Sequence, residues 1–270
     1  MIQRKFLQSA LIGSVAVAFG SAQLIPGANE NGPIVKSAIS IVTGDTLRSD
    51  STKAIVPTTA LSKFATALGA FQNLVRPLSD SRALSDAFNS YFAFKSAHAD
   101  QVRKPYLYFV DYGLPSTTPR GYVFDMDLLK VVDGPFMVAH GRGSSTSQYG
   151  VPTRFSNASG SNASSLGLYV AQQTYAFVGH TGGRAYGSIG LKLEGVSTGY
   201  NDNALARGVV AHGAPYVTPT KAGRSEGCPA MEPSRAQKLL PILSNGAMVF
   251  LFAPNQQWMQ SDPWVTATSE

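Results

Sequence analysis

Apolar side chains recur every three or four positions between residues 57 and 98, which is the spacing of one face of a helix. They are Leu61, Phe64, Ala65, Leu68, Phe71 and Val75, followed by Leu84, Phe88, Tyr91, Phe92 and Phe94. Pro77 interrupts the run, and Ser79 or Asp80 could cap a second helix. Two amphipathic helices are therefore predicted. We expect their aromatic side chains in the core or on a docking surface rather than around a cofactor.

From about residue 105 onward the pattern changes to short apolar runs separated by Gly, Ser, Asn and Pro. Runs of this kind between turn-forming residues are typical of strands. The predicted strands lie at 106–110, 122–126, 135–140, 166–171, 189–193, 208–212 and 247–252, and one late helix is predicted at 233–243. The fold class is therefore mainly β. We expect a sandwich or barrel of mostly antiparallel strands, with a short helical N-terminal segment and one late helix.

The first 22 residues have the pattern of a signal peptide. A basic start that includes Arg4 and Lys5 is followed by a mostly apolar run to Gly20, and small residues precede Ala22. The apolar run is shorter than a membrane span requires, so we expect cleavage after Ala22 and export to the periplasm or cell envelope. The predicted organisation is a signal peptide at 1–22, a flexible lead-in at 23–56, a helical segment at 57–103, a β-rich domain at 104–256 and a tail at 257–270.

The balance of charged residues narrows the choice of partners. The chain has 22 Lys and Arg against 16 Asp and Glu, which gives a net charge of +6. Loss of residues 1–22 would remove Arg4 and Lys5 and leave 20 − 16 = +4. The basic residues are scattered rather than clustered, so a nucleic-acid surface is not expected. The positive charge serves solubility, or attraction to a polyanion such as a cell wall or an anionic membrane surface.

The chain has a single cysteine, Cys228. Exported proteins usually carry paired cysteines or none, because a lone thiol invites incorrect disulfides. Cys228 is therefore either a small buried side chain or a reactive thiol. The sequence has no HxH or HxxxH pair of zinc-ligand spacing, so we expect neither a metal nor another cofactor.

The residues around the cysteine favour the reactive thiol. His212 ends an apolar strand, is followed by Gly213, and precedes Cys228 by 228 − 212 = 16 residues. A neighbouring imidazole can take the proton of a thiol or pair with the thiolate as imidazolium, and a backbone carbonyl can orient the imidazole. Gly227 lacks a Cβ, so a substrate carbonyl can approach the N–H groups of Gly227 and Cys228, which could hold an oxyanion.

The segment from His212 to Cys228 resembles the catalytic motif of L,D-transpeptidases, in which His-Gly is followed by a loop and then Ser-x-Gly-Cys. The continuation through Pro229 and Ala230 is similar to one branch of the YkuD-like murein L,D-transpeptidases. Upstream segments at 155–157, 164–167, 190–195 and 201–207 resemble the same branch in the same order. The resemblance covers about residues 104–253.

The resemblance implies a catalytic domain with Cys228 as nucleophile, His212 as base and a carbonyl near Gly213 as the orienting group. It implies a peptidoglycan stem peptide as acyl donor, attacked at the L-centre of its third residue with loss of a terminal D-amino acid. A thioester on Cys228 would then pass to an amine of a second stem, in cell-wall biogenesis and the maintenance of cell shape. Water as acceptor would make the site an L,D-carboxypeptidase, and a domain that only binds the wall is the other alternative. The oligomeric state stays open.

Ala230 departs from the family pattern, since many L,D-transpeptidases carry Arg or Asn two residues after the cysteine. Arg224 or Arg235 could supply the missing side chain. The candidate substrate contacts are Arg224, Ser225, Tyr216 and His180, of which Ser225 could instead bond the cysteine loop. His140 also ends a strand before a glycine, but no cysteine follows at similar spacing. We expect a structural role for His140, with site lining as the alternative.

Overall fold

The computed structural model describes residues 58–267, with side chains from residue 63 onward. The predicted signal peptide and lead-in at 1–56 lie outside the described residues. The helices are α1 (Thr58–Phe71), α2 (Ala83–Ala97), α3 (Pro233–Leu243) and α4 (Gln256–Met259). The strands are β1 (Tyr106–Asp111), β2 (Gly121–Asp125), β3 (Lys130–Phe136), β4 (His140–Gly141), β5 (Gly167–Thr181), β6 (Arg184–Gly195), β7 (Val210–Gly213), β8 (Val217–Thr218), β9 (Lys221–Ala222), β10 (Arg224–Ser225), β11 (Ala230–Met231) and β12 (Met248–Phe252).

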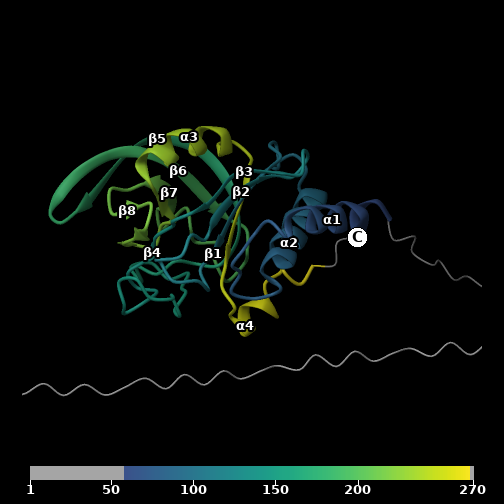
Figure 1. The fold of residues 1–270 in the computed structure, drawn as a ribbon, viewed down its shortest axis with the longest axis horizontal. Helices are drawn as coiled ribbons and strands as arrows, with labels where there is room; N and C mark the ends of the chain where they lie inside the picture. Colours follow the sequence, from purple (N-terminus) through teal and green to yellow (C-terminus); the bar gives the residue numbers. More distant parts are fainter. Residues whose placement is uncertain (1–57, 268–270) are drawn as a thin grey trace, which may run out of the picture. The chain divides into compact units, whose positions relative to one another are not determined.

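One large sheet organises the fold (Figure 1). Its eight strands follow the order β11-β7-β6-β5-β12-β1-β2-β3. β1 is parallel to β12 and β11 is parallel to β7, whereas the other neighbours are antiparallel. Two small sheets pair β10 with β4 and β8 with β9. The mainly β class is confirmed, and the large sheet is mixed.

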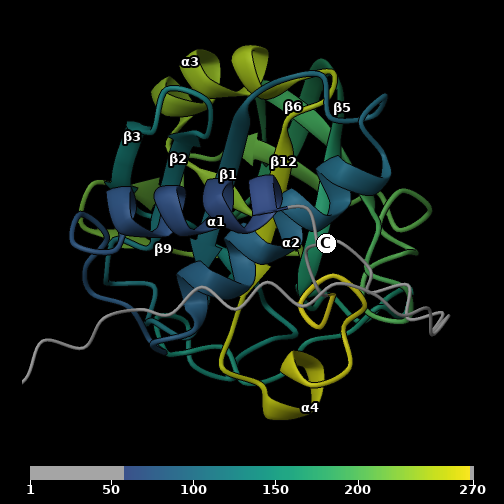
Figure 2. The same ribbon diagram turned by 90° about the vertical axis from the view of Figure 1, so that its right-hand side faces the viewer.

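The two N-terminal helices share a core with the sheet, and Figure 2 shows α1 and α2 lying across β1, β2 and β12. Phe71 of α1 packs against Phe124 of β2 with ring centroids 4.6 Å apart, and against Phe88 of α2 at 5.6 Å. All three rings are fully buried. The two predicted helices are present, but α2 starts at Ala83 and has no side-chain cap. Asp80 accepts the N–H of Arg82 instead, just before the helix begins.

Strands β5 and β6 form a long hairpin that extends beyond the rest of the sheet (Figure 1). Gly182 and Gly183 make the turn with φ angles of +54° and +73°, the backbone of a tight hairpin turn that favours glycine. The sequence pattern predicted only the buried parts of these strands, at 166–171 and 189–193. Residues 174–181 are mostly exposed or half-buried, and the apolar residues at 175–178 follow one another without the polar alternation that marks a half-buried strand.

The chain after the last core strand is also packed. Trp258 of α4 is buried and its indole N–H donates to Asp262 at 2.8 Å. Trp264 donates to the carbonyl of Val196, and the side-chain amide of Asn89 on α2 reaches the carbonyls of residues 264, 265 and 267. The segment described above as a tail is therefore fastened to the domain as far as residue 267. The late helix is confirmed as α3, with the predicted bounds.

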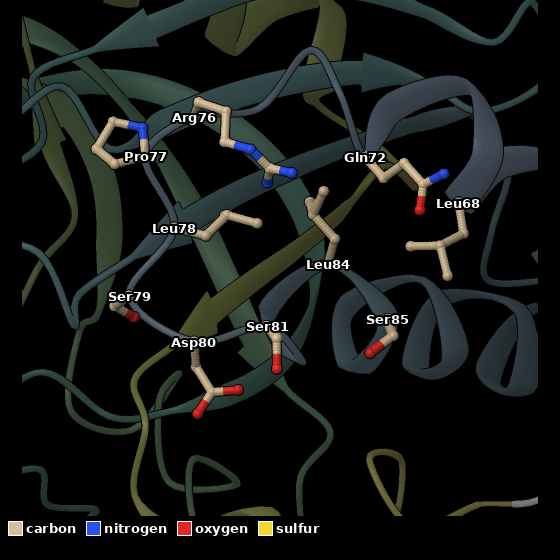
Figure 3. Close-up of a pocket in the computed structure, with 10 residues that line it drawn as sticks. All are labelled: Leu68, Gln72, Arg76, Pro77, Leu78, Ser79, Asp80, Ser81, Leu84 and Ser85. Atoms are coloured by element: carbon tan, nitrogen blue, oxygen red, sulfur yellow. The ribbon is translucent and has the colours of Figure 1, made fainter. Parts of the chain in front are cut away.

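A pocket of about 570 Å³ opens between the end of α1 and the start of α2 (Figure 3). Leu68, Leu78 and Leu84 give it an apolar base, and polar side chains such as Gln72 and Arg76 surround them. None of its lining residues belongs to the cysteine or histidine segments. Within residues 58–267, no helix is long and apolar enough to cross a membrane.

Candidate active site

Cys228 lies between β10 and β11, at one edge of the main sheet. Because β11 runs parallel to β7, Ala230 pairs with His212. Cys228 precedes Ala230 by two residues, and its sulfur lies beside Val210, which precedes His212 by two residues. The register of two short strands thus brings the cysteine and the histidine onto adjacent segments.

Backbone groups surround the half-buried Cys228 thiol. The Val210 N–H donates to Sγ at 3.5 Å, and the carbonyl oxygen of Gly208 lies 4.0 Å from Sγ as an acceptor for the S–H. Burial raises the pKa of the thiol above its ordinary value of 9.0, and the Glu226 carboxylate acts in the same direction. The Val210 N–H and the Arg207 guanidinium oppose this rise. Cys228 is therefore a protonated thiol at neutral pH.

Ser225 ties the cysteine loop together. Its hydroxyl donates to the carbonyl of Cys228 at 2.6 Å and accepts the N–H of Gly227 at 3.2 Å. The N–H of Gly227, which the sequence interpretation offered to an oxyanion, is thus already bonded within the loop. Gly227 has a φ of +122°, and a Cβ there would lie 2.9 Å from the carbonyl oxygen of Ala163. Both the backbone angle and the space behind it favour glycine.

His212 is buried at the end of β7, with its ring orientation set from two sides. Its Nδ1 lies 3.1 Å from the carbonyl oxygen of Gly213, and because a carbonyl only accepts, Nδ1 carries the proton and Nε2 is free to act as a base. The ring of Phe177 on β5 stacks on the imidazole, with centroids 4.3 Å apart and planes 28° apart. Burial lowers the pKa of His212 below 6.5, partly offset by the Gly213 carbonyl, so the imidazole is neutral at pH 7.

A half-buried thiol on a segment adjacent to the strand that carries a neutral, oriented imidazole fits a cysteine acyl-transfer site. Residues 77–252 match the model of the L,D-transpeptidase catalytic domain, which is more than half of the chain. The chain belongs to the L,D-transpeptidase family. No curated protein matches it.

Solved L,D-transpeptidases are similar to this chain at low identity. The enzyme from Mycobacterium smegmatis is 14% identical over 55% of this chain and 59% of its own, with a TM-score of 0.33. A mutant L,D-transpeptidase from Enterococcus faecium is 14% identical over 55% and 50%, with a TM-score of 0.34. One from Stackebrandtia nassauensis is 14% identical over 70% and 89%, with a TM-score of 0.33. The chain thus spans between half and three fifths of the length of the first two.

In this L,D-transpeptidase domain, Ala230 is enclosed rather than open to substrate. It is fully buried, paired with His212 on one side and bridged to Ala139 on the other. Arg235 is engaged elsewhere, in ion pairs with Asp133 and Glu232.

Arg224 is also engaged. Its Nη1 donates to the carbonyl of Ser145 at 3.0 Å and, at 3.4 Å, to that of Thr146. Both of the arginines considered as replacements for a side chain at position 230 thus hold other parts of the domain.

Aromatic side chains lie near the Cys228 thiol. Tyr216 packs edge-on against Tyr186 of β6 at 6.4 Å, and Tyr186 lies 6.3 Å from Phe177. Burial raises the pKa of Tyr216, and the neighbouring Tyr186 and Cys228 add to the rise, so its hydroxyl stays protonated. Of the predicted substrate contacts, Tyr216 thus lies close enough to Cys228 to interact with it. His180 is exposed near the hairpin tip, and because strand side chains alternate it faces away from the side that carries Phe177.

The sequence interpretation did not single out Arg207, an arginine that lies close to the cysteine loop. Arg207 precedes β7, and its guanidinium lies behind Gly227, where a Cβ would come within 3.7 Å of Nη2. Nothing in the local sequence distinguishes Arg207 from an arginine of a surface turn, because its neighbours in space come from residues 156–165. The only available signal was its place in the segment 201–207, which resembles the family.

His140 is structural in its contacts but close to the cysteine loop. Its Nδ1 accepts from Arg120 at 2.9 Å, and β4 pairs His140 with Arg224. Because arginine only donates, the proton of His140 is on Nε2, a buried atom that has no hydrogen-bond partner in the described part of the chain. Burial, with Arg120 and Arg224, lowers its pKa to about 3. No group of three or more potential metal ligands occurs among the described residues.

Proposed function

We propose that this chain is an exported peptidoglycan L,D-transpeptidase that works through a thioester on Cys228. The observation that carries the proposal is the pairing of β11 with β7, which sets the Cys228 thiol beside Val210 and the oriented imidazole of His212 on the adjacent strand. Membership of the L,D-transpeptidase family supports the substrate class, and the N-terminal pattern of the sequence supports export.

In the first half-reaction the thiol proton passes to Nε2 of His212 as the sulfur attacks the donor carbonyl carbon. The C–N bond to the terminal D-amino acid then breaks, and the imidazolium returns the proton to the leaving amine. The Gly213 carbonyl stabilises the imidazolium, since it accepts the hydrogen bond from Nδ1–H throughout. The products are a thioester on Cys228 and a free D-amino acid.

The tetrahedral intermediate carries a negative oxygen that needs donors. The Gly227 N–H is bonded to Ser225, so the Cys228 N–H is the donor that we assign to the oxyanion from this loop. Ser225 also donates to the carbonyl of Cys228. The direction of the Cys228 N–H is set by Ser164, whose hydroxyl donates at 3.0 Å to the Gly227 carbonyl in the same peptide plane. Ser225 is thus assigned to the loop rather than to the substrate.

In the second half-reaction an amine of another stem peptide attacks the thioester carbon. His212 takes one proton from the amine and returns it to the departing sulfur, which restores the thiol and completes the crosslink. Water in place of the amine gives the L,D-carboxypeptidase reaction at the same site. The approach to the thiol is apolar, since it is formed by the rings of Tyr216, Tyr186 and Phe177. An apolar approach favours the amine of a stem peptide over water as the acceptor.

The test uses purified mature protein and muropeptides that end in D-Ala. We expect release of D-Ala, a mass increase on Cys228 and crosslinked products. Cys228→Ser should lower D-Ala release by at least about a thousandfold, because the hydroxyl is a far weaker nucleophile in this setting. His212→Ala should lower it by about 10²–10⁴-fold, the usual contribution of a general base.

His98→Ala is the matched control for the histidine change. His98 packs on Phe94 and Trp264, with centroids 4.7 and 5.7 Å away, and belongs to no part of the site. Its removal should leave the turnover rate unchanged. D-Ala release that survives in Cys228→Ser would exclude Cys228 as the nucleophile. A protein that binds muropeptides and forms no adduct would be a wall-binding domain instead.

A further inference from the structure

Arg207 carries a positive charge that no carboxylate neutralises at close range. Its guanidinium makes four hydrogen bonds, all to neutral acceptors. Nη1 donates to the carbonyl of Ser156 at 2.7 Å and to Ser165 Oγ at 3.3 Å. Nη2 donates to the carbonyl of Ala163 at 2.7 Å and to Ser161 Oγ at 3.2 Å. Among the described residues, no ion pair within 4 Å involves Arg207.

The same bonds fix where the charge sits. Ala163 lies directly behind Gly227, since a Cβ on Gly227 would be 2.9 Å from its carbonyl oxygen and 3.7 Å from Nη2 of Arg207. Gly227 is the residue before the nucleophile. A charge held by four bonds in a half-buried setting is not free to swing into solvent, and its field is screened less than that of a surface arginine.

We propose that Arg207 is a positioning residue of the reaction, a fixed cation behind Gly227 that stabilises negative charge on the Cys228 sulfur. The inference rests on the proposed function, because it assumes that the sulfur becomes negative during attack and again when the thioester is broken. Arg207 would also take the place of the Arg side chain that many L,D-transpeptidases carry two residues after the cysteine, where this chain has Ala230. The chain has its cation beside the nucleophile, but supplies it from the turn before β7 rather than from β11.

Other charged and titratable groups around the sulfur do not replace Arg207. Glu226 has the opposite sign and is exposed, where it pairs with Arg142. His212 is neutral at rest. The tyrosines that interact with the sulfur all have raised pKa values and stay uncharged: Tyr112, Tyr169, Tyr175, Tyr186 and Tyr216. Within the described residues, Arg207 is the cation that lies behind Gly227 and works to lower the pKa of the Cys228 thiol.

The test follows the rate of alkylation by iodoacetamide from pH 6 to pH 10. Cys228 is the only cysteine, so all label reports on this site. Arg207→Gln should shift the profile to higher pH. Each tenfold loss of thiolate slows alkylation about threefold, because a more basic thiolate is a better nucleophile. We expect Arg207→Gln to be at least about threefold slower than the parent at pH 8.

Two further variants and the sign of the change separate the effect of charge from that of structure. Arg207→Lys keeps the charge but loses the paired bonds, and should stay closer to the parent than Arg207→Gln. Arg103→Gln removes the same charge from an exposed arginine that does not act on the thiol, and should leave the profile unchanged. A purely structural role predicts the opposite sign, since a loosened loop exposes the half-buried thiol and speeds alkylation.

A second pair of variants serves if Arg207→Gln does not fold. Ser161→Asp places a carboxylate against Nη2 of Arg207 and neutralises the cation without breaking its other bonds. Ser161→Asn introduces a side chain of the same size as Asp but without its charge. The inference predicts slower alkylation in Ser161→Asp than in Ser161→Asn.

Equal rates in the Ser161 pair, or an equal or faster rate in folded Arg207→Gln, would overturn the role of Arg207 and leave the transpeptidase proposal standing. Failure of the parent to release D-Ala, while these alkylation differences persist, would overturn the function alone.

Discussion

At the scale of single residues, the proposed reacting pair of Cys228 and His212 rests in its neutral form. Burial raises the pKa of Cys228 and lowers that of His212, whereas a resting thiolate–imidazolium pair would need the reverse of both changes. In the proposed reaction the proton therefore moves from the thiol to the imidazole during attack. The Val210 N–H and the Gly213 carbonyl are in place to stabilise the two charges that then appear.

This neutral pair predicts a broad pH profile for kcat/KM. On the acid side activity falls when His212 is protonated, at a pH below the ordinary 6.5. On the alkaline side it falls when Cys228 ionises, above 9.0, because His212 then receives no proton to give to the leaving amine. Steady-state assays on a soluble muropeptide check both limits. An acid limb centred above 6.5, or an alkaline limb centred below 9.0, would contradict the neutral resting pair.

His140 predicts a pH dependence of stability rather than of activity. Its pKa is about 3 in the folded chain against an ordinary 6.5, so only the unfolded chain binds its proton between these values. The free energy of unfolding should therefore fall as the pH drops from 6.5 toward 3, by about 2 kcal/mol between pH 6.5 and 5. Asp86 acts in the opposite direction, since burial raises its pKa to about 6.

The variant His140→Gln isolates the histidine from Asp86. The glutamine oxygen can still accept from Arg120, and the residue does not titrate. Urea unfolding of parent and variant at pH 6.5 and 5 gives the comparison. We expect the parent to lose about 2 kcal/mol more than the variant over this interval. Equal losses would mean that His140 is protonated in the folded chain.

At the scale of elements, the β5–β6 hairpin is part of the site and not only of the sheet. Its side chains alternate, so one face turns Phe177 onto the His212 ring and Tyr186 toward Tyr216, while the other carries exposed Val178. The ring of Phe177 excludes water from the imidazole. The low pKa of His212 thus depends in part on a strand distant from it in the sequence.

Phe177→Ala should therefore raise the pKa of His212 toward 6.5, because water would reach the imidazole. The acid limb of the kcat/KM profile should move to higher pH, with activity near pH 6 reduced more than activity near pH 8. Phe177→Leu keeps an apolar cover and should retain more of the parent profile. A uniform loss of activity at every pH would show that the ring only supports the fold.

Some elements of the fold could be predicted from the sequence, and others could not. The helices at 58–71 and 83–97 and the late helix at 233–243 were predictable, because each has a helical apolar period and flanking breakers. The candidate pair of Cys228 and His212 stood out from local motifs, and its catalytic role stays a prediction. The outer hairpin was not predictable, since its exposed half has no apolar alternation. The place of Arg207 was not predictable either, because its proposed role depends on its closeness to Gly227, which only the folded chain creates.

At the scale of the whole molecule, the N-terminal helices, the sheet and the segment after β12 share one hydrophobic core. Phe71 and Phe88 meet Phe124 under the sheet, and Trp258 lies under Phe250 and Phe252. The strands alone would expose these surfaces. We therefore expect the predicted β-rich domain at 104–256 not to fold without the segments on either side.

Phe71→Ala tests this shared core with little change to the site. It should cost about 3–5 kcal/mol of unfolding free energy, the usual range for a fully buried phenylalanine. Leu74→Ala is the matched control, since Leu74 is 60% exposed and its truncation should cost within about 0.5 kcal/mol. Urea unfolding monitored by tryptophan fluorescence gives both values. Similar costs for the two variants would mean that α1 packs loosely on the sheet.

The hydrogen bond from the Val210 amide to the Cys228 sulfur also provides an internal spectroscopic indicator. The chemical shift of an amide proton responds to the charge on its acceptor, so the Val210 resonance should titrate with the thiol. The same resonance should move again when the sulfur becomes a thioester, since the acceptor is then neutral and carries no proton. Nuclear magnetic resonance could thus follow ionisation and acylation of the nucleophile in the unmodified protein, without a label.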